Sequence, residues 1–324
     1  MGAMRRLRDF LGLIRFEHTI FALPFALVAA IFSQRWLNDL HGAAGTLPLF
    51  APSAKWHAFT TSVFHAEVSG AGVFPSVYDL GFILLAMVSG RTLAMLCDRV
   101  IDAGIDARNP RTASRHIPAG RISPRQAKQW AVISAAVFFI AALALNWWCF
   151  VLAPLALAWL IGYPYAKRFT PFAHYVLAGA QAIAPVGVFL AITATISWEI
   201  FPLAVAVGLW VGSFDIYYVL QDVEFDRAEG LHSLPADFGE RPAMMAALVG
   251  HLLTGALLIW TCYIFATGAF LIIATLAFTA VLAAEHLLVH ARRDLIGVAF
   301  FTVNGLLSVC YLVVAVVSRM SAVA

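Results

Sequence analysis

Five aspartates occur in two groups with a spacing of four residues. The first group is Asp98, Asp102 and Asp106, and the second is Asp222 and Asp226; each group follows a long apolar stretch. Residues four apart lie on one face of a helix about one turn apart, so each group predicts an acidic stripe at a helix end. Mg²⁺ prefers one or two carboxylates together with water and phosphate oxygens, so two facing stripes suit magnesium and a diphosphate. All five aspartates are therefore candidate metal ligands.

Cationic side chains accompany the aspartates. Arg91 lies inside an apolar run, where an unpaired arginine is costly, and this favours a functional role for it. Arginine binds phosphate oxygens through two nitrogens, whereas lysine binds them as a point charge. The other candidates for diphosphate binding lie in loops: Arg111, Arg115, Lys167 and Arg168. A role as topology anchors is an equal alternative for Lys167 and Arg168.

The composition is that of an integral membrane protein. Hydrophobic residues make up 62% of the chain and charged residues 12%, whereas a soluble domain has roughly 25% charged residues. The apolar stretches are long and aperiodic, which indicates helices and excludes the short alternating segments of a membrane barrel. The net charge of +3 gives no indication of nucleic-acid binding. We therefore predict an all-α, polytopic protein whose environment is the lipid bilayer. Four cysteines without paired spacing are expected to be buried thiols: Cys97, Cys149, Cys262 and Cys310.

Apolar stretches of about 20 residues, the length that crosses a bilayer, number nine. They cover residues 19–36, 77–97, 127–145, 147–165, 171–193, 199–220, 243–263, 268–289 and 296–317. Residues 1–17 carry arginines on one side and apolar side chains on the other, and they predict an interfacial helix. Residues 37–76 are rich in small residues and predict an extracytoplasmic loop; His41, His57 and His65 in it lack the spacing of a metal site. We expect residues 1–324 to form a single membrane domain.

Lysine and arginine are distributed unevenly between the two sides that nine spans define. Most of them fall at the N-terminus and in residues 98–126, 166–170, 221–242 and 290–295, which all lie on one side. Because positive loops face the cytoplasm, this side is predicted to be cytoplasmic. Both aspartate groups then belong to a cytoplasmic cap over the helical bundle, in the inner membrane of a cell.

Longer motifs surround the acidic groups. They are Arg91-x7-Arg99, NPRTASRHIPAG at 109–120, YPYAKR at 163–168, GLHSLP at 230–235 and FEHTIFALPF at 16–25. Together they resemble the intramembrane aromatic prenyltransferases of the UbiA superfamily, and the resemblance extends over nearly the whole chain. It implies a lipid-open helical bundle that moves a polyprenyl chain from its diphosphate to an aromatic acceptor, using Mg²⁺.

The resemblance also implies roles for individual residues. The first motif of the family usually begins with Asn, where this chain has Asp98, so it stays open whether Asp98 contacts metal or orients a neighbour. Asp102 and Asp106 match the acids of the first motif, and Asp222 and Asp226 match those of the second. The sequence indicates no obligate protein partner.

Elementary chemistry supports such a reaction. An allylic diphosphate loses its leaving group more easily when metal ions and cations neutralise the developing charge. The resulting allylic cation must be shielded from water, which a bundle interior provides. A carboxylate must then accept the proton of the aromatic ring. Asp215, two turns before Asp222, is the candidate for this base or for orienting the acceptor, and a structural role is an equal alternative.

Two questions stay open at this point. The segments 16–25, 109–120 and 230–235 look most like 4-hydroxybenzoate polyprenyltransferases and their relatives of the futalosine menaquinone route, whose acceptor is a dihydroxynaphthoate. The sequence does not separate these acceptors. The second question is whether the aspartates serve an ion-coupled transporter instead. Such a transporter predicts acids near the middle of the membrane, whereas these lie at helix ends beside arginine-rich loops.

Overall fold

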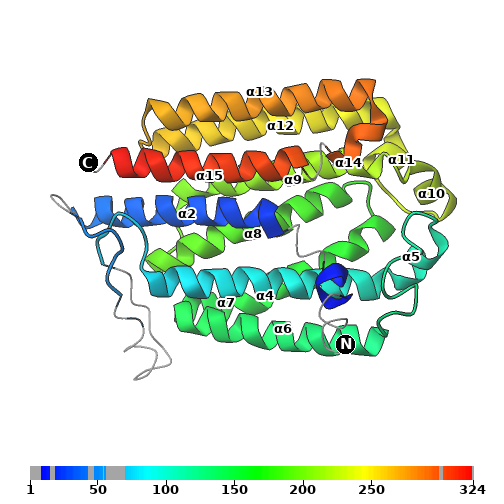
Figure 1. The fold of residues 1–324 in the computed structure, drawn as a ribbon, viewed down its shortest axis with the longest axis horizontal. Helices are drawn as coiled ribbons and strands as arrows, with labels where there is room; N and C mark the ends of the chain where they lie inside the picture. Colours follow the sequence, from blue (N-terminus) through cyan, green and yellow to red (C-terminus); the bar gives the residue numbers. More distant parts are fainter. Residues whose placement is uncertain are drawn as a thin grey trace.

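The structure is a computed structural model that describes residues 9–14, 19–42, 47–53, 55, 70–298 and 302–322. In this part of the chain the regular structure is helical, apart from one isolated parallel bridge between Phe50 and Phe74. Figure 1 shows the long helices running along a common direction, with the short helices α5 (Ala103–Arg108), α10 (Val223–Ala228) and α11 (Leu234–Phe238) gathered at one end. We call this end the cap end and the opposite one the loop end.

Eight spans within the described residues are long and apolar enough to cross a membrane. They are α4 (Val77–Ile101), α6 (Pro124–Leu145), α7 (Trp147–Gly162) with η2 (Tyr163–Arg168), α8 (Ala173–Thr193), η3 (Trp198–Ile200) with α9 (Phe201–Val219), α12 (Glu240–Ile264), α13 (Ala269–Ala291) and α15 (Asn304–Ser321). A further long helix, α2 (Thr19–Leu40), packs against α8 and α15. The prediction of an all-α, multi-pass membrane protein is confirmed, whereas the count of nine spans depends on α2 and stays a prediction.

Most span boundaries differ from those expected by a few residues, and the start of the last span lies partly outside the described residues. It was expected at residue 296, where α14 (Ile296–Val298) follows the turn η4 (Arg293–Leu295); residues 299–301 are not described, and α15 extends from Asn304 to Ser321. Arg293 donates to Glu240 at 3.0 Å, which ties this turn to the start of α12.

The helix α2 continues to Leu40, beyond the expected end at residue 36. Its polar end stays helical because two amides bind the chain that returns from the loop. Gln34 donates to the carbonyl of Gly70 at 2.9 Å, and Asn38 donates to that of Gly72 at 2.7 Å.

Side-chain caps fix several helix starts. Ser76 caps α4 by accepting from the backbone nitrogen of Asp79. Ser123 and Gln126 form a reciprocal capping box at the start of α6, where proline occupies the first turn. Asn146 ends α6 and caps α7, which explains how a single residue turns the chain between two spans.

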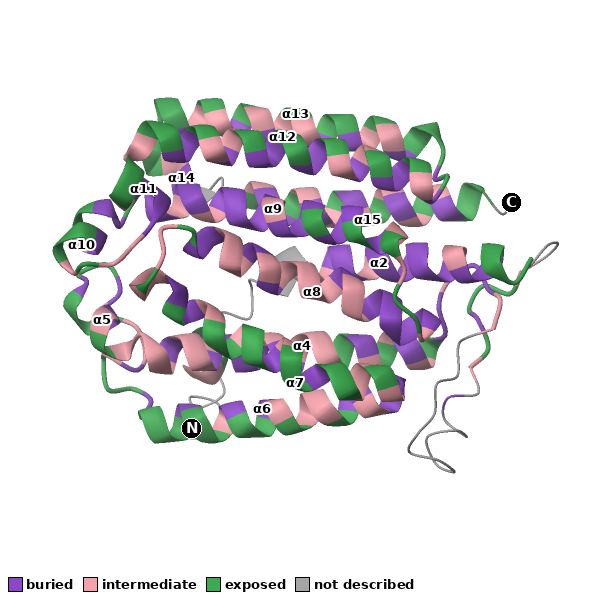
Figure 2. Cartoon of the chain, turned by 180° about the vertical axis from the view of Figure 1, so that it is seen from behind, coloured by how far each residue is buried: buried purple, intermediate pink, exposed green. Residues whose placement is uncertain are grey.

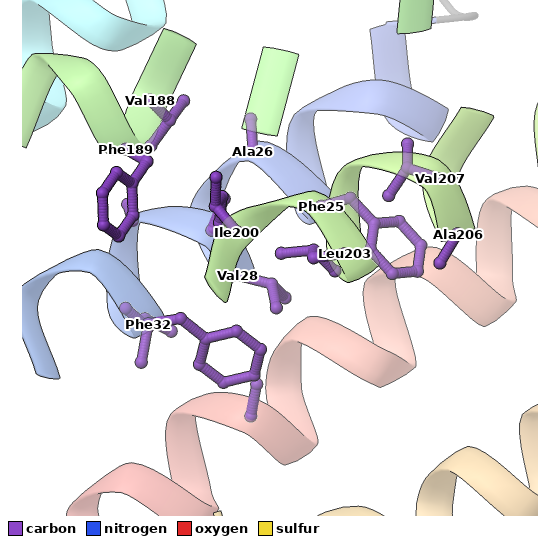
Figure 3. Packing of buried hydrophobic residues seen from close by; sticks show 14 of the residues in the cluster. Phe25, Ala26, Val28, Phe32, Val188, Phe189, Ile200, Leu203, Ala206 and Val207 are labelled. Carbon is purple, nitrogen blue, oxygen red and sulfur yellow. The ribbon is translucent and has the colours of Figure 1, made fainter. Parts of the chain in front are cut away.

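The core of the bundle surrounds α9. In the apolar window of the α9 span 78% of the residues are buried, against 28% for α6. Figure 2 shows the same contrast between α9 and α2, which are largely buried, and the outer helix α6. Figure 3 shows Phe25 of α2 beside Leu203 and Val207 of α9, and the rings of Phe25 and Trp210 lie 5.0 Å apart. Because large aromatic contacts fix α9 on several sides, its side chains hold well-defined positions.

The segments outside the spans pack closely on the bundle where they are described. Residues 9–13 are helical, with Leu13 and Ile14 buried in a cluster that includes α4 and α6. In the loop at the opposite end, Lys55 forms a fully buried ion pair with Asp79 at 2.7 Å and donates to the carbonyl of Ala191 at 2.6 Å. The single domain, the interfacial helix over 1–17 and the side of the membrane on which 37–76 lies stay predictions.

The remaining expectations concern histidines and thiols. His41 is exposed, and His57 and His65 lie outside the described residues. All four cysteines are free, as expected, although only Cys262 is fully buried and Cys310 is exposed on α15.

Candidate active site

A cavity of about 290 Å³ lies at the cap end, among α4, α5, η2, α8, α9 and α10. The structure brings the predicted carboxylates and cations together, because every one of them lines this cavity: Arg91, Asp98, Asp102, Asp106, Arg111, Arg115, Lys167, Arg168, Asp215, Asp222 and Asp226. The two aspartate groups, more than a hundred residues apart in the chain, therefore share one site.

The two groups have the same local backbone. The helix α4 ends at Ile101, and Asp102 joins it to the short helix α5 with φ −94° and ψ 5°. Asp222 precedes the short helix α10 with φ −113° and ψ 3°. The expected continuous stripes are thus interrupted, but hydrogen bonds keep the four-residue register: the nitrogens of Asp106 and Asp226 donate to the carbonyls of Asp102 and Asp222, both at 2.8 Å. Each group therefore presents two carboxylates on one side of the chain.

Each carboxylate of the first group forms an ion pair with a cationic side chain. Arg115 places one nitrogen 2.6 and 2.8 Å from the two carboxylate oxygens of Asp106. Arg168, from η2, donates to Asp102 at 2.9 Å and to the carbonyl of Ile101 at 3.1 Å. Asp98, on the last turns of α4, pairs with Arg99 at 2.8 Å. A different cation thus faces each acid of the first group.

The second group is paired in the same way, partly by residues from the first half. Arg111 lies in the loop after α5, yet its Nε donates to Asp222 at 2.8 Å, a second nitrogen contacts the other oxygen, and a third nitrogen donates to the Tyr218 hydroxyl at 2.8 Å. Asn109 also donates to Asp222, at 3.1 Å. Lys167 lies 3.9 Å from Asp226, at the outer limit of an ion pair. These contacts tie the two halves of the cap to each other.

Burial makes two of the carboxylates, Asp102 and Asp226, harder to ionise. The pKa of the Asp102 carboxyl is raised to about 7, first by burial and then by the nearby Asp98 carboxylate, while Arg168 opposes the shift. Burial also raises the pKa of Asp226, and Lys167 partly offsets this. Charged acids in such a site need cations beside them. A proton, an arginine or a metal ion can each meet that need.

The donor atoms suit one class of metal. Carboxylate oxygens are hard ligands, which favour Mg²⁺ over the softer metals that thiols and imidazoles select. No point among the described residues gathers three or more acidic, histidine or cysteine side chains. Mg²⁺ needs only one or two carboxylates when phosphate oxygens and water complete its shell. The residues therefore fit magnesium carried with a phosphate-bearing substrate better than an independent metal centre.

Several residues of the site were not found from the sequence. Asn109 and Tyr218 contact Asp222 or its partner arginine, and Tyr163 and Gln181 line the cavity. His174, at the start of α8, binds Asp215 at 2.8 Å. Asn109 and Tyr163 belong to the motifs 109–120 and 163–168, and this membership is their only signal in the sequence. Tyr218, Gln181 and His174 lie in apolar runs without a diagnostic spacing, so nothing in the sequence marks them.

Comparisons with known proteins agree with this geometry. The UbiA prenyltransferase family matches residues 58–315 of the chain. The 4-hydroxybenzoate octaprenyltransferase of Serratia proteamaculans (strain 568) is 28% identical over 266 residues, which cover 80% of this chain and 83% of that protein. The enzyme of the same name from Pseudomonas putida (strain W619) is 30% identical over 187 residues, covering 56% of this chain and 60% of that protein.

Solved structures show the same fold. A UbiA homologue from Aeropyrum pernix K1 has a TM-score of 0.73 at 26% identity, covering 95% of this chain and 98% of that one. A UbiA homologue from Archaeoglobus fulgidus, bound to GPP and Mg²⁺, has a TM-score of 0.63 at 18% identity, covering 96% and 99%. These matches give the transporter alternative no support. Because the family match covers most of its length, the chain belongs to the UbiA prenyltransferase family.

Proposed function

We propose that this prenyltransferase moves a polyprenyl group from a polyprenyl diphosphate to a small aromatic acid, either 4-hydroxybenzoate or a dihydroxynaphthoate. The product would enter ubiquinone or menaquinone biosynthesis. The observation that carries the proposal is the meeting of two aspartate groups and their cations around one cavity. The names of the relatives support 4-hydroxybenzoate as acceptor, and the Archaeoglobus structure with GPP and Mg²⁺ supports a prenyl diphosphate as donor.

The aspartates are the proposed magnesium ligands. Asp102 and Asp106 would hold Mg²⁺ ions on one side of the cavity, together with Asp222 and Asp226 on the other. Magnesium, when bound, neutralises the charge that develops on the leaving diphosphate. Asp98 faces the same cavity and either contacts the metal or orients Arg99, with which it pairs.

The cations are the proposed diphosphate ligands. Arg111, Arg115, Lys167 and Arg168 each pair with an aspartate in the structure, and Arg91 lines the same cavity. On substrate binding, the arginine forks would exchange carboxylate for phosphate oxygens, which have matching geometry. The carboxylates that the arginines leave would then be available as metal ligands.

The inner wall of the cavity is suited to the reactive part of the donor. Met95, Leu177, Val211 and Phe214 line it, and apolar walls exclude water from an allylic cation. Asp215 lies among them and has an exposed fraction of 20%. We assign to Asp215 the acceptance of the ring proton or the orientation of the acceptor.

The protein is proposed to lie in the inner membrane with its cap in the cytoplasm. The cap end carries the arginine-rich segments 98–126 and 221–242, and such segments face the cytoplasm in most membrane proteins. Donor and acceptor would both be supplied from that side.

A direct assay tests the proposal. The purified protein in lipid nanodiscs would receive a radiolabelled prenyl diphosphate, Mg²⁺ and each aromatic acid in turn, and the lipid-soluble product would be counted. We expect product with one of the two acids. The variants Asp102→Asn and Asp222→Asn should each lower the rate by about 10²-fold or more, because they remove charge that the transition state needs.

An aspartate at the same end but outside the cavity provides the control. Asp294 is exposed and pairs only locally with Arg292 at 2.8 Å, so Asp294→Asn should leave the rate unchanged. Absence of product with every acid, or equal loss in all three variants, would contradict the proposed function.

A further inference from the structure

A histidine–aspartate pair lies in the wall of the cavity, at the contact between α8 and α9. Asp215 of α9 lines the cavity, whereas His174 of α8 has an exposed fraction of 0% and lies behind the wall. The Nδ1 atom of His174 is 2.8 Å from Oδ2 of Asp215. Among the described residues this is the only hydrogen bond that the ring forms.

Close packing of the two helices holds the pair rigidly. A Cβ at Gly208 would lie 2.6 Å from the carbonyl oxygen of Ala178, and one at Gly212 would lie 3.0 Å from that of His174. Glycine at these two positions therefore lets the backbones approach each other. The short backbone separation gives both side chains of the pair little freedom to move.

The surroundings of the ring indicate which of its two nitrogens carries the proton. The Nε2 atom of His174 is buried and has no hydrogen-bond partner among the described residues. An orphaned buried N–H is rarer than an orphaned acceptor, and neutral imidazole carries its proton on only one nitrogen. The proton is therefore best placed on Nδ1, from which it is donated to Oδ2 of Asp215.

We propose that His174 is a positioning residue for the aromatic acceptor step, an inference that rests on the proposed function. By engaging Oδ2, it holds the Asp215 carboxylate with Oδ1 free for the acceptor. After the prenyl carbon has bonded to the ring, the ring C–H bond breaks and its electrons restore aromaticity. The proton goes to Oδ1 of Asp215 and then to the diphosphate product. His174 touches neither substrate, because it is fully buried.

Substitutions separate this role from simple packing. The amide nitrogen of Asn can take the place of Nδ1, so His174→Asn should keep kcat within a few-fold of the wild type. His174→Leu removes the donor and should lower kcat by at least 10-fold, within the 10²–10⁴-fold that a positioned base typically contributes. The KM for the diphosphate should stay unchanged in both, because His174 is fully buried behind the cavity wall and touches no substrate.

A kinetic isotope effect identifies the step. With ring-deuterated acceptor, the wild type should show little effect on kcat, and His174→Leu a larger one, because loss of the ring proton becomes rate-limiting. Asp215→Asn should show the same increase, and the double variant should lose no more than the worse single one. His251, buried to an exposed fraction of 1% in another part of the bundle, supplies the control, and His251→Leu should show no isotope effect.

Each result is decisive. Equal losses in His174→Leu and His174→Asn without an isotope effect would assign a packing role to His174 and overturn the proposal. If the wild type transfers prenyl groups and His174→Leu is equally active, the role proposed for His174 is overturned. The proposed function then stands. No transfer by the wild type would refute the proposed function and the inference together.

The protonation state can be measured without turnover. In ¹⁵N-histidine-labelled protein in nanodiscs, NMR should report the Nδ1–H tautomer for His174, and Asp215→Asn should alter its signal. An Nε2–H tautomer in the wild type would contradict the inferred hydrogen bond, whatever the activity of the protein.

Discussion

The buried ion pair at the loop end gives the sharpest test of how the bundle is held together. Lys55 and Asp79 both have side-chain exposed fractions of 0%, at a separation of 2.7 Å. Lys55 also donates to the carbonyl of Ala191, and the Ser76 hydroxyl donates to Asp79 at 2.6 Å. These contacts join the loop to α4 and α8. We predict that Lys55→Met is strongly destabilising.

The size of the expected loss in stability follows from the buried charge that each substitution leaves unpaired. Removing one partner of a buried pair leaves an uncompensated charge, which costs about 3–5 kcal/mol. Asp79→Asn should cost a similar amount, because it leaves the ammonium group of Lys55 without its counter-charge. The double variant Lys55→Met/Asp79→Asn should recover much of the loss, since no unpaired charge then remains. A coupling energy of about 2–3 kcal/mol is therefore expected, at the upper end of values for residues in contact.

The free energy of unfolding in mixed detergent micelles, measured for the four proteins of the cycle, tests this prediction. The exposed pair Arg292–Asp294, with exposed fractions of 62% for both side chains, is the matched control. Its coupling energy should be much smaller than that of the buried pair, because water screens exposed charges. Additive losses for Lys55 and Asp79 would refute the reasoning, because they would mean that the two charges do not compensate each other.

Three further predictions concern the cavity. Arg111→Lys should raise the KM for the prenyl diphosphate by about 10-fold, because it loses the fork and therefore about one charge-assisted hydrogen bond; an unchanged KM in steady-state assays would contradict the role assigned to Arg111. The Mg²⁺ concentration for half-maximal rate should rise as the pH falls below about 7, by up to about 10-fold per pH unit. The reason is that the raised pKa leaves Asp102 protonated there, and a proton competes with the metal. A flat profile between pH 6 and 8 would exclude Asp102 as a ligand. Chelation with EDTA should abolish transfer, and Mg²⁺ should restore it better than Zn²⁺, because the donors are oxygens; recovery with Zn²⁺ alone would argue for a different ligand set.

Most charged residues of the cavity could be predicted from the sequence because their signals are local. Aspartates four residues apart after an apolar stretch share one face of a helix end, and their place in the sequence indicates their depth in the membrane. The position of Arg91 inside an apolar run likewise indicates its depth. The assignment of partners could not be predicted in this way. Arg111 follows Asp106 by only five residues, yet it binds Asp222, because the loop after α5 folds across to the α10 side of the cap. Such a contact depends on how two distant segments dock.

The contacts that could not be predicted likewise depend on how distant segments dock. Lys55 and Asp79 are 24 residues apart, with part of a small-residue loop between them, so no periodicity connects them. His174 is a single polar residue at the start of an apolar helix, and only the neighbouring helix gives it a partner.

The pairing of each cap aspartate with its own cation has a consequence for how ligands enter the site. A metal ion arriving alone must displace an arginine or lysine that then has no anion, and a diphosphate arriving alone must leave the aspartates without a counter-charge. Each ligand removes the penalty that the other meets, so their binding should be cooperative, and reciprocally so. We therefore expect weak affinity for either one separately and tight capture of the metal–diphosphate complex, with the original partners re-forming when pyrophosphate departs.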